Sequence, residues 1–321
     1  MAKLKTFIRV ISKATLWVAG IFALIFIILA GVIQLPSVQN ALVSFATGYI
    51  SNKTHTRVEI EHVGISFPNA LSLEGVFLED IQKDTLLYVG EARVNLSLKD
   101  VLSNHINVRH LYLDKAVVKV YNAPTDSLFN YHFLLTAFSS DTTTNAPSNP
   151  WTFNLDQLNI SNSMISYEDI YNHLYTKASI HQLKIKGINV DTHEFSLKVD
   201  EISLKDNAII YQSEREPVNK KVFDAGNLQF SQLNMELRDI VYNEAKTEVT
   251  VKQFSAADQN NFTITRFETV FKMDTHSITL APLKVNTSTS FIEGDIQLQF
   301  ASLSSIADSL GQLKIKADIR K

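Results

Sequence analysis

The sequence predicts a mainly β protein, in which an N-terminal transmembrane helix and a short amphipathic helix precede an elongated, curved antiparallel β-sheet trough. Three observations carry this prediction. An uncharged apolar run fills residues 16–33, apolar residues recur with a helical period within residues 36–56, and strand-like alternation dominates from residue 57 onward. Residues 1–35 are therefore expected to form a basic cytoplasmic tail and a membrane anchor, and the bulk of the chain to form sheet.

The predicted anchor is the run LWVAGIFALIFIILAGVI at residues 16–33. A helix of this length is about long enough to cross a hydrocarbon core of ~30 Å. Basic residues precede the run and no acidic residue occurs before Glu59, so the positive-inside rule predicts a cytoplasmic N-terminus and a single pass. A cleaved signal peptide is the alternative, but the nearest small-residue cleavage pattern, at Ala46, lies too far beyond the run. The residues expected to anchor the chain include Leu16, Trp17, Phe22, Phe26 and Ile33.

Residues 36–56 are expected to form the amphipathic helix. Val38, Leu42, Phe45 and Tyr49 recur at the spacing of one helix face. The helix either covers the end of a sheet or lies along the membrane interface, and the two interpretations are compatible.

The rest of the chain alternates apolar and polar residues, as in VNLSL at residues 94–98. Such alternation places one face of a strand against an apolar environment and leaves the other in water. Residues 57–138 are expected to form the N-terminal part of the trough, with one short helix around residues 126–138. The Ser/Thr/Asn/Pro-rich stretch 139–150 is predicted to be a linker or loop, and residues 151–321 a repeating trough segment.

Four segments share one plan: HLYLDKAVVKVY (110–121), QLNISNSMISY (157–167), EISLKDNAIIY (201–211) and PLKVNTSTSFI (282–292). In each, an alternating strand is expected to reach a polar turn of Asp, Asn, Lys or Ser, followed by a returning strand. The loose period of about 40 residues predicts a stacked antiparallel sheet. At roughly 10–12 residues per strand with its turn and ~4.8 Å per strand, the sheet would hold about 22–26 rungs over 105–125 Å.

Composition and motifs argue against catalytic chemistry. The chain has no cysteine and a formal net charge of -3, which disfavours Cys-ligated metals and nucleic-acid binding. It contains no GxGxxG, GxxxxGK(S/T), GxSxG or HExxH motif. We therefore expect no enzyme activity, no cofactor, no metal site and no nucleic-acid partner.

Two clusters of acidic residues and histidine are interpreted as structural. The tripeptide Asp-Thr-His occurs at residues 191–193 and again at 274–276, each time where one alternating strand ends and another begins. Aspartate suits such turns because its side chain hydrogen-bonds nearby backbone. Glu168, Asp169 and His173 do not converge when placed on a strand or turn, and we expect them to be solvated polar residues.

The alternation leaves a large apolar sheet face that few helices can cover. A bare face of this size requires either a fold that closes on itself or a ligand. A trough, apolar inside and polar outside, suits acyl chains, whereas two walls packed as a sandwich would leave a dry core; the sequence leaves both open. The candidate groove residues are Leu71, Leu73, Val94, Leu96, Leu113, Ile160, Leu197, Leu204 and Val285.

A family resemblance adds to this interpretation. The anchor, the segment LPSVQNALVSFATGYISNKTHTRVEIEHVGISFPNALSLEGVFLED and the wording QKDTLLYVGEARVNLSL resemble the start of TamB-like (translocation and assembly module) proteins of the AsmA-like superfamily, in their Bacteroidota type. Over residues 150–321 the likeness rests on the general plan, as in LKVNTSTSFIEGDIQLQF. TamB-like proteins are normally much longer and end in a further C-terminal domain, so we expect this chain to correspond to their N-terminal portion or to a truncated member.

The resemblance implies a bacterial inner-membrane anchor, an elongated periplasmic β-trough and a role in outer-membrane biogenesis. It implies two kinds of partner, namely phospholipid passing toward the outer membrane and an outer-membrane protein of the Omp85 class. The leading hypothesis is a lipid-binding or lipid-conducting trough. The alternative is a non-conducting scaffold for assembly of outer-membrane β-barrels or for protein secretion, and a membrane-anchored enzyme ranks last.

Overall fold

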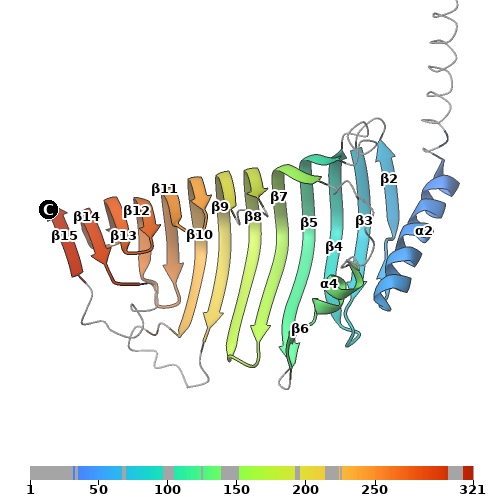
Figure 1. Cartoon of the computed structure of the whole chain (residues 1–321), viewed down its shortest axis with the longest axis horizontal. Helices are drawn as coiled ribbons and strands as arrows, with labels where there is room; N and C mark the ends of the chain where they lie inside the picture. The colour runs from blue at the N-terminus through green and yellow to red at the C-terminus, as the bar shows by residue number, and fades with distance from the viewer. Residues whose placement is uncertain are drawn as a thin grey trace, which may run out of the picture.

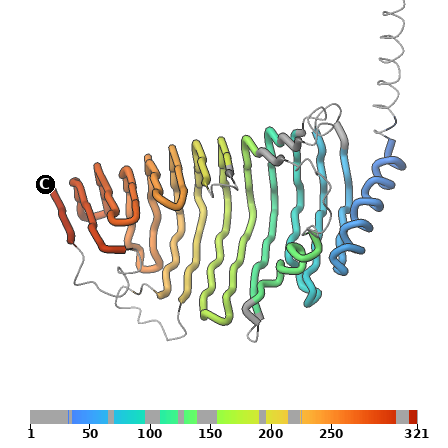
Figure 2. The backbone as a smooth tube through the Cα atoms, in the orientation of Figure 1, coloured from blue at the N-terminus to red at the C-terminus, as the bar shows by residue number. Residues whose placement is uncertain are grey.

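The structure is a computed structural model, and its described residues are 32, 35–66, 70–96, 105–123, 126–138, 152–191, 196–213, 224, 226–302 and 314–320. They form one 15-stranded sheet with two helices. Figure 1 shows the strands side by side in a single layer, with α2 at one end and β15 at the other; the tube in Figure 2 follows the same curved layer. The prediction of a mainly β fold built on a long, curved, open and largely antiparallel sheet is confirmed.

The helices are α2 (Pro36–Thr54) and α4 (His132–Phe138). The N-terminal strands are β1 (Val58–Glu59), β2 (His62–Ser66), β3 (Ala70–Glu79), β4 (Thr85–Leu96), β5 (His105–Ala123) and β6 (Asp126–Phe129). The later strands are β7 (Thr152–Asp169), β8 (Leu174–Asp191), β9 (Ser196–Gln212), β10 (Asn227–Tyr242), β11 (Lys246–Asp258), β12 (Thr263–Asp274), β13 (Ser277–Thr287), β14 (Phe291–Gln299) and β15 (Lys314–Arg320).

Two predictions concern segments outside the described residues. The expected anchor at residues 16–33 lies outside them except for Val32, and so does the expected linker at residues 139–150. Among the residues that the structure does describe, no helix is both long and apolar enough to cross a membrane.

Neighbours in the sheet mostly follow chain order, and their pairing is antiparallel with one exception. β5 and β7 pair in parallel, with His105 opposite Thr152 and Tyr121 opposite Glu168. The expectation of a purely antiparallel sheet is therefore wrong at this step. Parallel neighbours need a crossover of a dozen or more residues, and the chain between β5 and β7 supplies it with β6 and α4. The helix expected around residues 126–138 is correspondingly shorter, because Asp126–Phe129 pairs with β5 as a strand.

The strands are longer than expected because three of the four predicted turns do not reverse the chain. The segments 110–121, 157–167 and 201–211 each lie within one continuous strand, β5, β7 and β9. Only the fourth segment contains a real turn, between Thr287 and Ser290, where the Thr287 amide donates to the Ser290 carbonyl at 2.8 Å. The hairpin interpretation is thus wrong for the first three segments.

At these positions the strands continue through a local irregularity of the backbone. Residues with positive φ, in the left-handed region, mark them: Lys115 (53°), Asn162 (48°), Asp206 (55°) and Gln232 (51°). Polar side chains from the next strand then bond the displaced backbone. The Ala116 amide donates to Ser163 Oγ at 2.8 Å, and the His181 amide donates to Asn207 Oδ1 at 2.8 Å. Around Gln232 the pairing of β10 with β9 and with β11 also shifts register, as at a β-bulge.

Because each strand is longer than predicted, the sheet contains fewer strands and extends less far across them. Of its 15 strands, β2 and β6 lie off the main path, so thirteen strands follow one another from β1 to β15. At ~4.8 Å between neighbours this path is about 60 Å long. The predicted 22–26 rungs and 105–125 Å are therefore wrong for the described residues.

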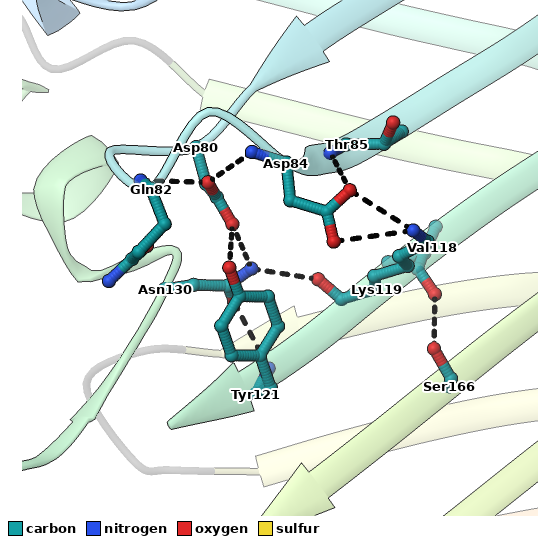
Figure 3. A network of polar contacts seen from close by, with 9 residues as sticks. All are labelled: Asp80, Gln82, Asp84, Thr85, Val118, Lys119, Tyr121, Asn130 and Ser166. Atoms are coloured by element: carbon teal, nitrogen blue, oxygen red, sulfur yellow. Dashed lines mark hydrogen bonds and ion pairs between the residues drawn. The ribbon is translucent and has the colours of Figure 1, made fainter. Parts of the chain in front are cut away.

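A buried carboxylate joins three segments at the N-terminal end of the sheet (Figure 3). Asp80, in the β3–β4 turn, is only 1% exposed. It accepts backbone hydrogen bonds from Gln82 and Asp84 at 2.9 Å, and side-chain bonds from the Tyr121 hydroxyl at 2.6 Å and Asn130 Nδ2 at 3.0 Å. Burial, followed by the hydrogen bond and charge of Asp80, raises the pKa of Tyr121 above its usual value. The network fastens the β6–α4 connection to β5 and to the turn.

Helix α2 lies at the end of the sheet, where it contacts β1 and β2, but not through the face expected from the sequence. Gln39 and Thr54 are buried, whereas Leu42, Phe45 and Tyr49 of the expected apolar face are exposed. The helix therefore covers the sheet end, and among the described residues nothing covers its Leu–Phe–Tyr face.

Candidate functional site

Two rows of apolar residues cross the sheet on one face. Directly opposed residues on neighbouring strands point to the same side of a sheet, so the strand register identifies each row. Row 1 consists of Leu73, Ala92, Leu113, Ile160, Leu183, Leu204, Met235 and Phe254. Row 2 consists of Leu71, Val94, Leu111, Leu158, Ile185, Ile202, Leu237 and Val251. Together rows 1 and 2 define the apolar face.

Row 1 continues toward the C-terminal end through aromatic contact. The rings of Phe254 and Phe267 meet edge to face with centroids 6.2 Å apart. Phe267 lies opposite Val285, and Val285 lies opposite Ile292. Apolar side chains therefore follow one another from β3 to β14.

The residues between the two rows point to the other side of the sheet and are mostly polar. This outer row consists of Ser72, Arg93, Tyr112, Asn159, Lys184, Ser203, Glu236 and Gln253. The sheet thus has one apolar face and one polar face over eight strands. This division is the arrangement that the alternation in sequence predicted.

The structure places most of the predicted groove residues on the apolar face. Leu73, Leu113, Ile160 and Leu204 lie in row 1, and Leu71 and Val94 lie in row 2. Val285 joins row 1 through its contact with Phe267, while Leu197 lies opposite Tyr242 near the start of β9 and Leu96 is the last residue of β4. The prediction omitted members contributed by other strands, such as Leu183, Met235 and Phe254. The sequence did contain a signal for two of them, namely the apolar alternation of Leu183 with Ile185 and of Met235 with Leu237.

The apolar face is packed most closely near the N-terminal end. Val89, Ala92 and Ala116 form a buried cluster there, with Leu73 and Leu113 packed against it. Farther along, residues of row 1 such as Leu204 are only half-buried. Contiguous apolar surface of this extent usually marks a binding or interaction site.

Nothing in the described part of the chain forms a second layer over the C-terminal two thirds of this face. The described strands belong to one open sheet, and the substantial contacts beyond neighbouring strands are those of α2 with β1, β2 and α4. Two walls packed as a sandwich are therefore contradicted for the described residues.

The polar face is held by charge pairs between neighbouring strands. Glu201, whose side chain is 18% exposed, lies between Lys186 Nζ at 3.0 Å and an Arg238 guanidinium nitrogen at 3.8 Å. The hydrogen bond from Lys186 is the main reason that the pKa of Glu201 lies below its usual value, and the positive charges of Lys186 and Arg238 add to it. The carboxylate therefore favours the folded state most strongly when it is ionised.

Glu201→Gln is expected to lower the free energy of unfolding by about 0.5–1 kcal/mol near pH 7, because the pair is partly exposed. Since the folded pKa is depressed, this contribution is present above the unfolded pKa and disappears as pH falls through the folded pKa. Urea unfolding across acidic and neutral pH measures it. Glu244→Gln, in the exposed β10–β11 turn, is the control and is expected to change stability little. An equal loss for Glu201→Gln at low and neutral pH would contradict the electrostatic account.

The acidic and histidine clusters are structural in the described residues. Asp274 Oδ1 accepts backbone hydrogen bonds from His276 and Ser277 at 2.7 Å, which together with the Ser277 hydroxyl hold the pKa of Asp274 below its usual range. The turn interpretation is confirmed there. In the matching tripeptide, Asp191 is the last residue of β8, and residues 192–193 lie outside the described part.

Asp169 is buried. The expectation that it is a solvated polar residue is therefore wrong. It accepts hydrogen bonds from Asn122 Nδ2 at 2.8 Å and from Asn172 Nδ2 at 2.7 Å, and the bonds from Asn172 lower its pKa. Glu168 and His173 line a small cavity with it at the β7–β8 turn. Across the described ranges, no group of three or more His, Asp or Glu side chains is arranged to hold a metal ion.

Comparison with known proteins returns no match, either to a protein-family model or to a curated protein. The resemblance to TamB-like proteins accordingly stays a prediction, and the candidate site rests on the geometry of the apolar face.

Proposed function

We propose that this chain is an inner-membrane-anchored periplasmic protein of outer-membrane biogenesis, and that its apolar face is the wall of a trough that binds or conducts phospholipid. The single observation that supports this best is the continuity of row 1 and row 2 from β3 to β11. A face interrupted by charges would not accommodate an acyl chain, because each buried CH₂ contributes about 0.8 kcal/mol only in apolar surroundings. The anchoring part of the proposal rests on the sequence of residues 16–33.

The dimensions of the apolar face suit more than one acyl chain. Eight strands at ~4.8 Å spacing give each row a length of about 34 Å. One leaflet of a bilayer provides about 15 Å of hydrocarbon, half of the ~30 Å core. A lipid lying along a row would therefore have room to move from strand to strand, which favours conduction over a single closed binding pocket.

A second candidate function is a scaffold for assembly of outer-membrane β-barrels, and one observation favours it. Every residue of β15 is exposed, and among the described strands β15 pairs only with β14. Within the described residues, the side of β15 away from β14 offers backbone groups to which a partner strand can be added. The partner that the resemblance implies is an outer-membrane protein of the Omp85 class. Neither function assigns a catalytic residue or a cofactor to the chain.

Site-specific photo-crosslinking distinguishes the two functions. A benzophenone side chain is placed at Leu183 or Leu204 in row 1, and in matched controls at Lys184 or Ser203 in the outer row. The full chain is irradiated in bacterial membranes, and adducts are identified by lipid mass spectrometry. We expect phospholipid adducts at Leu183 and Leu204, with about tenfold fewer at the outer positions.

The contrary outcomes are equally specific. Protein adducts without lipid at Leu183 and Leu204 would overturn the lipid function and favour the scaffold. Equal lipid yields at inner and outer positions would show that the adducts come from lipid around the protein, not from the apolar face.

A further inference from the structure

Helix α2 carries an apolar surface that the sheet does not use. The residues turned to the sheet end are buried or half-buried and largely polar or β-branched: Gln39, Val43, Thr47, Ile50 and Thr54. Another set points away from the sheet and is exposed: Leu35 (52%), Leu42 (47%), Phe45 (75%) and Tyr49 (55%). We call this second set the α2 stripe.

The α2 stripe is continuous along the helix. Leu42, Phe45 and Tyr49 are separated by three and four residues, a spacing that aligns side chains on one helical face. Leu35, whose backbone is extended, precedes them as the N-cap. Lys53 extends the line by one more turn, with its Nζ 5.9 Å from the Tyr49 ring and 4.8 Å from the ring of Phe138 on α4. Phe138 is itself 47% exposed, so the surface ends in an aromatic residue and a cation.

The chemistry of this surface and its place in the chain identify its partner. The uncharged run at residues 16–33 ends just before Leu35, the residue that caps α2. The helix has no acidic residue, and its only charged residue is Lys53. Leucine and phenylalanine suit the acyl boundary of a bilayer, tyrosine suits its interface, and lysine reaches its phosphates. We infer that the α2 stripe lies in the interface of the bilayer that the predicted anchor enters.

The placement of α2 in the interface sets the orientation of the whole sheet. In Figure 1, α2 runs alongside β2, roughly along the strand direction. With α2 lying in the membrane plane, the strands also run along the membrane surface. Rows 1 and 2 cross the strands and therefore lead away from the membrane, from β3 toward β14. The inference rests on the proposed anchor, but not on lipid binding by the apolar face.

Fluorescence quenching by lipid tests this placement directly. The chain has no cysteine, so a single introduced cysteine gives a unique label site. Leu42→Cys and Phe45→Cys place a nitrobenzoxadiazole label on the stripe, and Asn40→Cys and Ser44→Cys place it on exposed positions of other faces of the same helix. The full chain is reconstituted in phosphatidylethanolamine–phosphatidylglycerol vesicles that contain lipid with a nitroxide near the headgroup. Quenching is expected to be about threefold stronger at the stripe positions than at the controls.

A label at Phe26→Cys, quenched by a nitroxide deep in the acyl region, reports the anchor separately. Quenching at Phe26 with equal, weak quenching at all four helix positions would overturn the inference while leaving the anchor intact. No quenching at Phe26 or on the stripe would overturn both the inference and the anchor. Disulfide formation between copies of Phe45→Cys, with the stripe shielded from lipid nitroxide, would show that a second copy covers the stripe and would also overturn the inference. None of these outcomes alters the crosslinking result at Leu183 and Leu204.

Discussion

Leu204→Asp is expected to reduce phospholipid crosslinking at the neighbouring position Leu183 by about tenfold or more, equivalent to a loss of at least ~1.4 kcal/mol of lipid affinity. Leu204 is half-buried in the middle of row 1, opposite Leu183 and Met235. A carboxylate there would need water where the proposed acyl chain lies, and desolvating it is costly. The measurement is the yield of lipid adducts from a benzophenone at Leu183 in the full chain.

Ser203→Asp is the matched control, because it adds the same charge one residue away on the polar face, opposite Lys184 and Glu236. Its lipid yield should match that of the unmodified chain. Circular dichroism of both variants establishes that each retains the sheet. Undiminished adducts in a folded Leu204→Asp variant would contradict the role of row 1.

Asp80→Ala is expected to lower the free energy of unfolding by about 3–4 kcal/mol and to expose the β6–α4 connection. The substitution leaves four donors without their acceptor, including the Tyr121 hydroxyl and Asn130 Nδ2. Hydrogen bonds to a buried charged group contribute about 1.5–3 kcal/mol each, and orphaned buried donors carry a further penalty. Urea unfolding measures the loss, and hydrogen exchange over residues 126–138 locates it.

The control for this substitution is Asp84→Ala, in the same turn. The Asp84 side chain is 51% exposed and pairs with Lys119 Nζ at 3.1 Å, so its removal is expected to cost only about 0.5 kcal/mol. A loss for Asp80→Ala as small as about 0.5 kcal/mol would mean that the turn tolerates replacement of Asp80, and that the network in Figure 3 is not what holds α4 in place.

Local sequence determined which residues share a face of the sheet. Leu113, Ile160 and Leu204 occupy matching positions in three segments that share one plan, and the register places all three in row 1. The match succeeded because side chains alternate between the two faces along each regular stretch of strand, so the apolar period is a property of the chain itself. The same alternation separated Ser72 and Lys184 from their apolar neighbours.

Whether the chain reverses or continues was decided only by tertiary structure. The residues around Lys115, Asn162 and Asp206 have the polar character of turns, yet each lies inside one long strand. A turn and an irregularity within a strand make the same local demands, namely a residue that tolerates positive φ and a side chain that bonds exposed backbone. What distinguishes them is a partner distant in the chain, such as Ser163 Oγ for the Ala116 amide.

The two sides of α2 show the same division between local sequence and tertiary structure. The sequence determined that Leu42, Phe45 and Tyr49 share one side of a helix, because the helical period is local. It did not determine which side meets the sheet. That choice depends on the shape of the sheet end at β1 and β2, which receives the side containing Val43 and Thr54 and leaves the larger side chains exposed. Periodicity is set by covalent geometry, whereas the partner of each face is set by long-range packing.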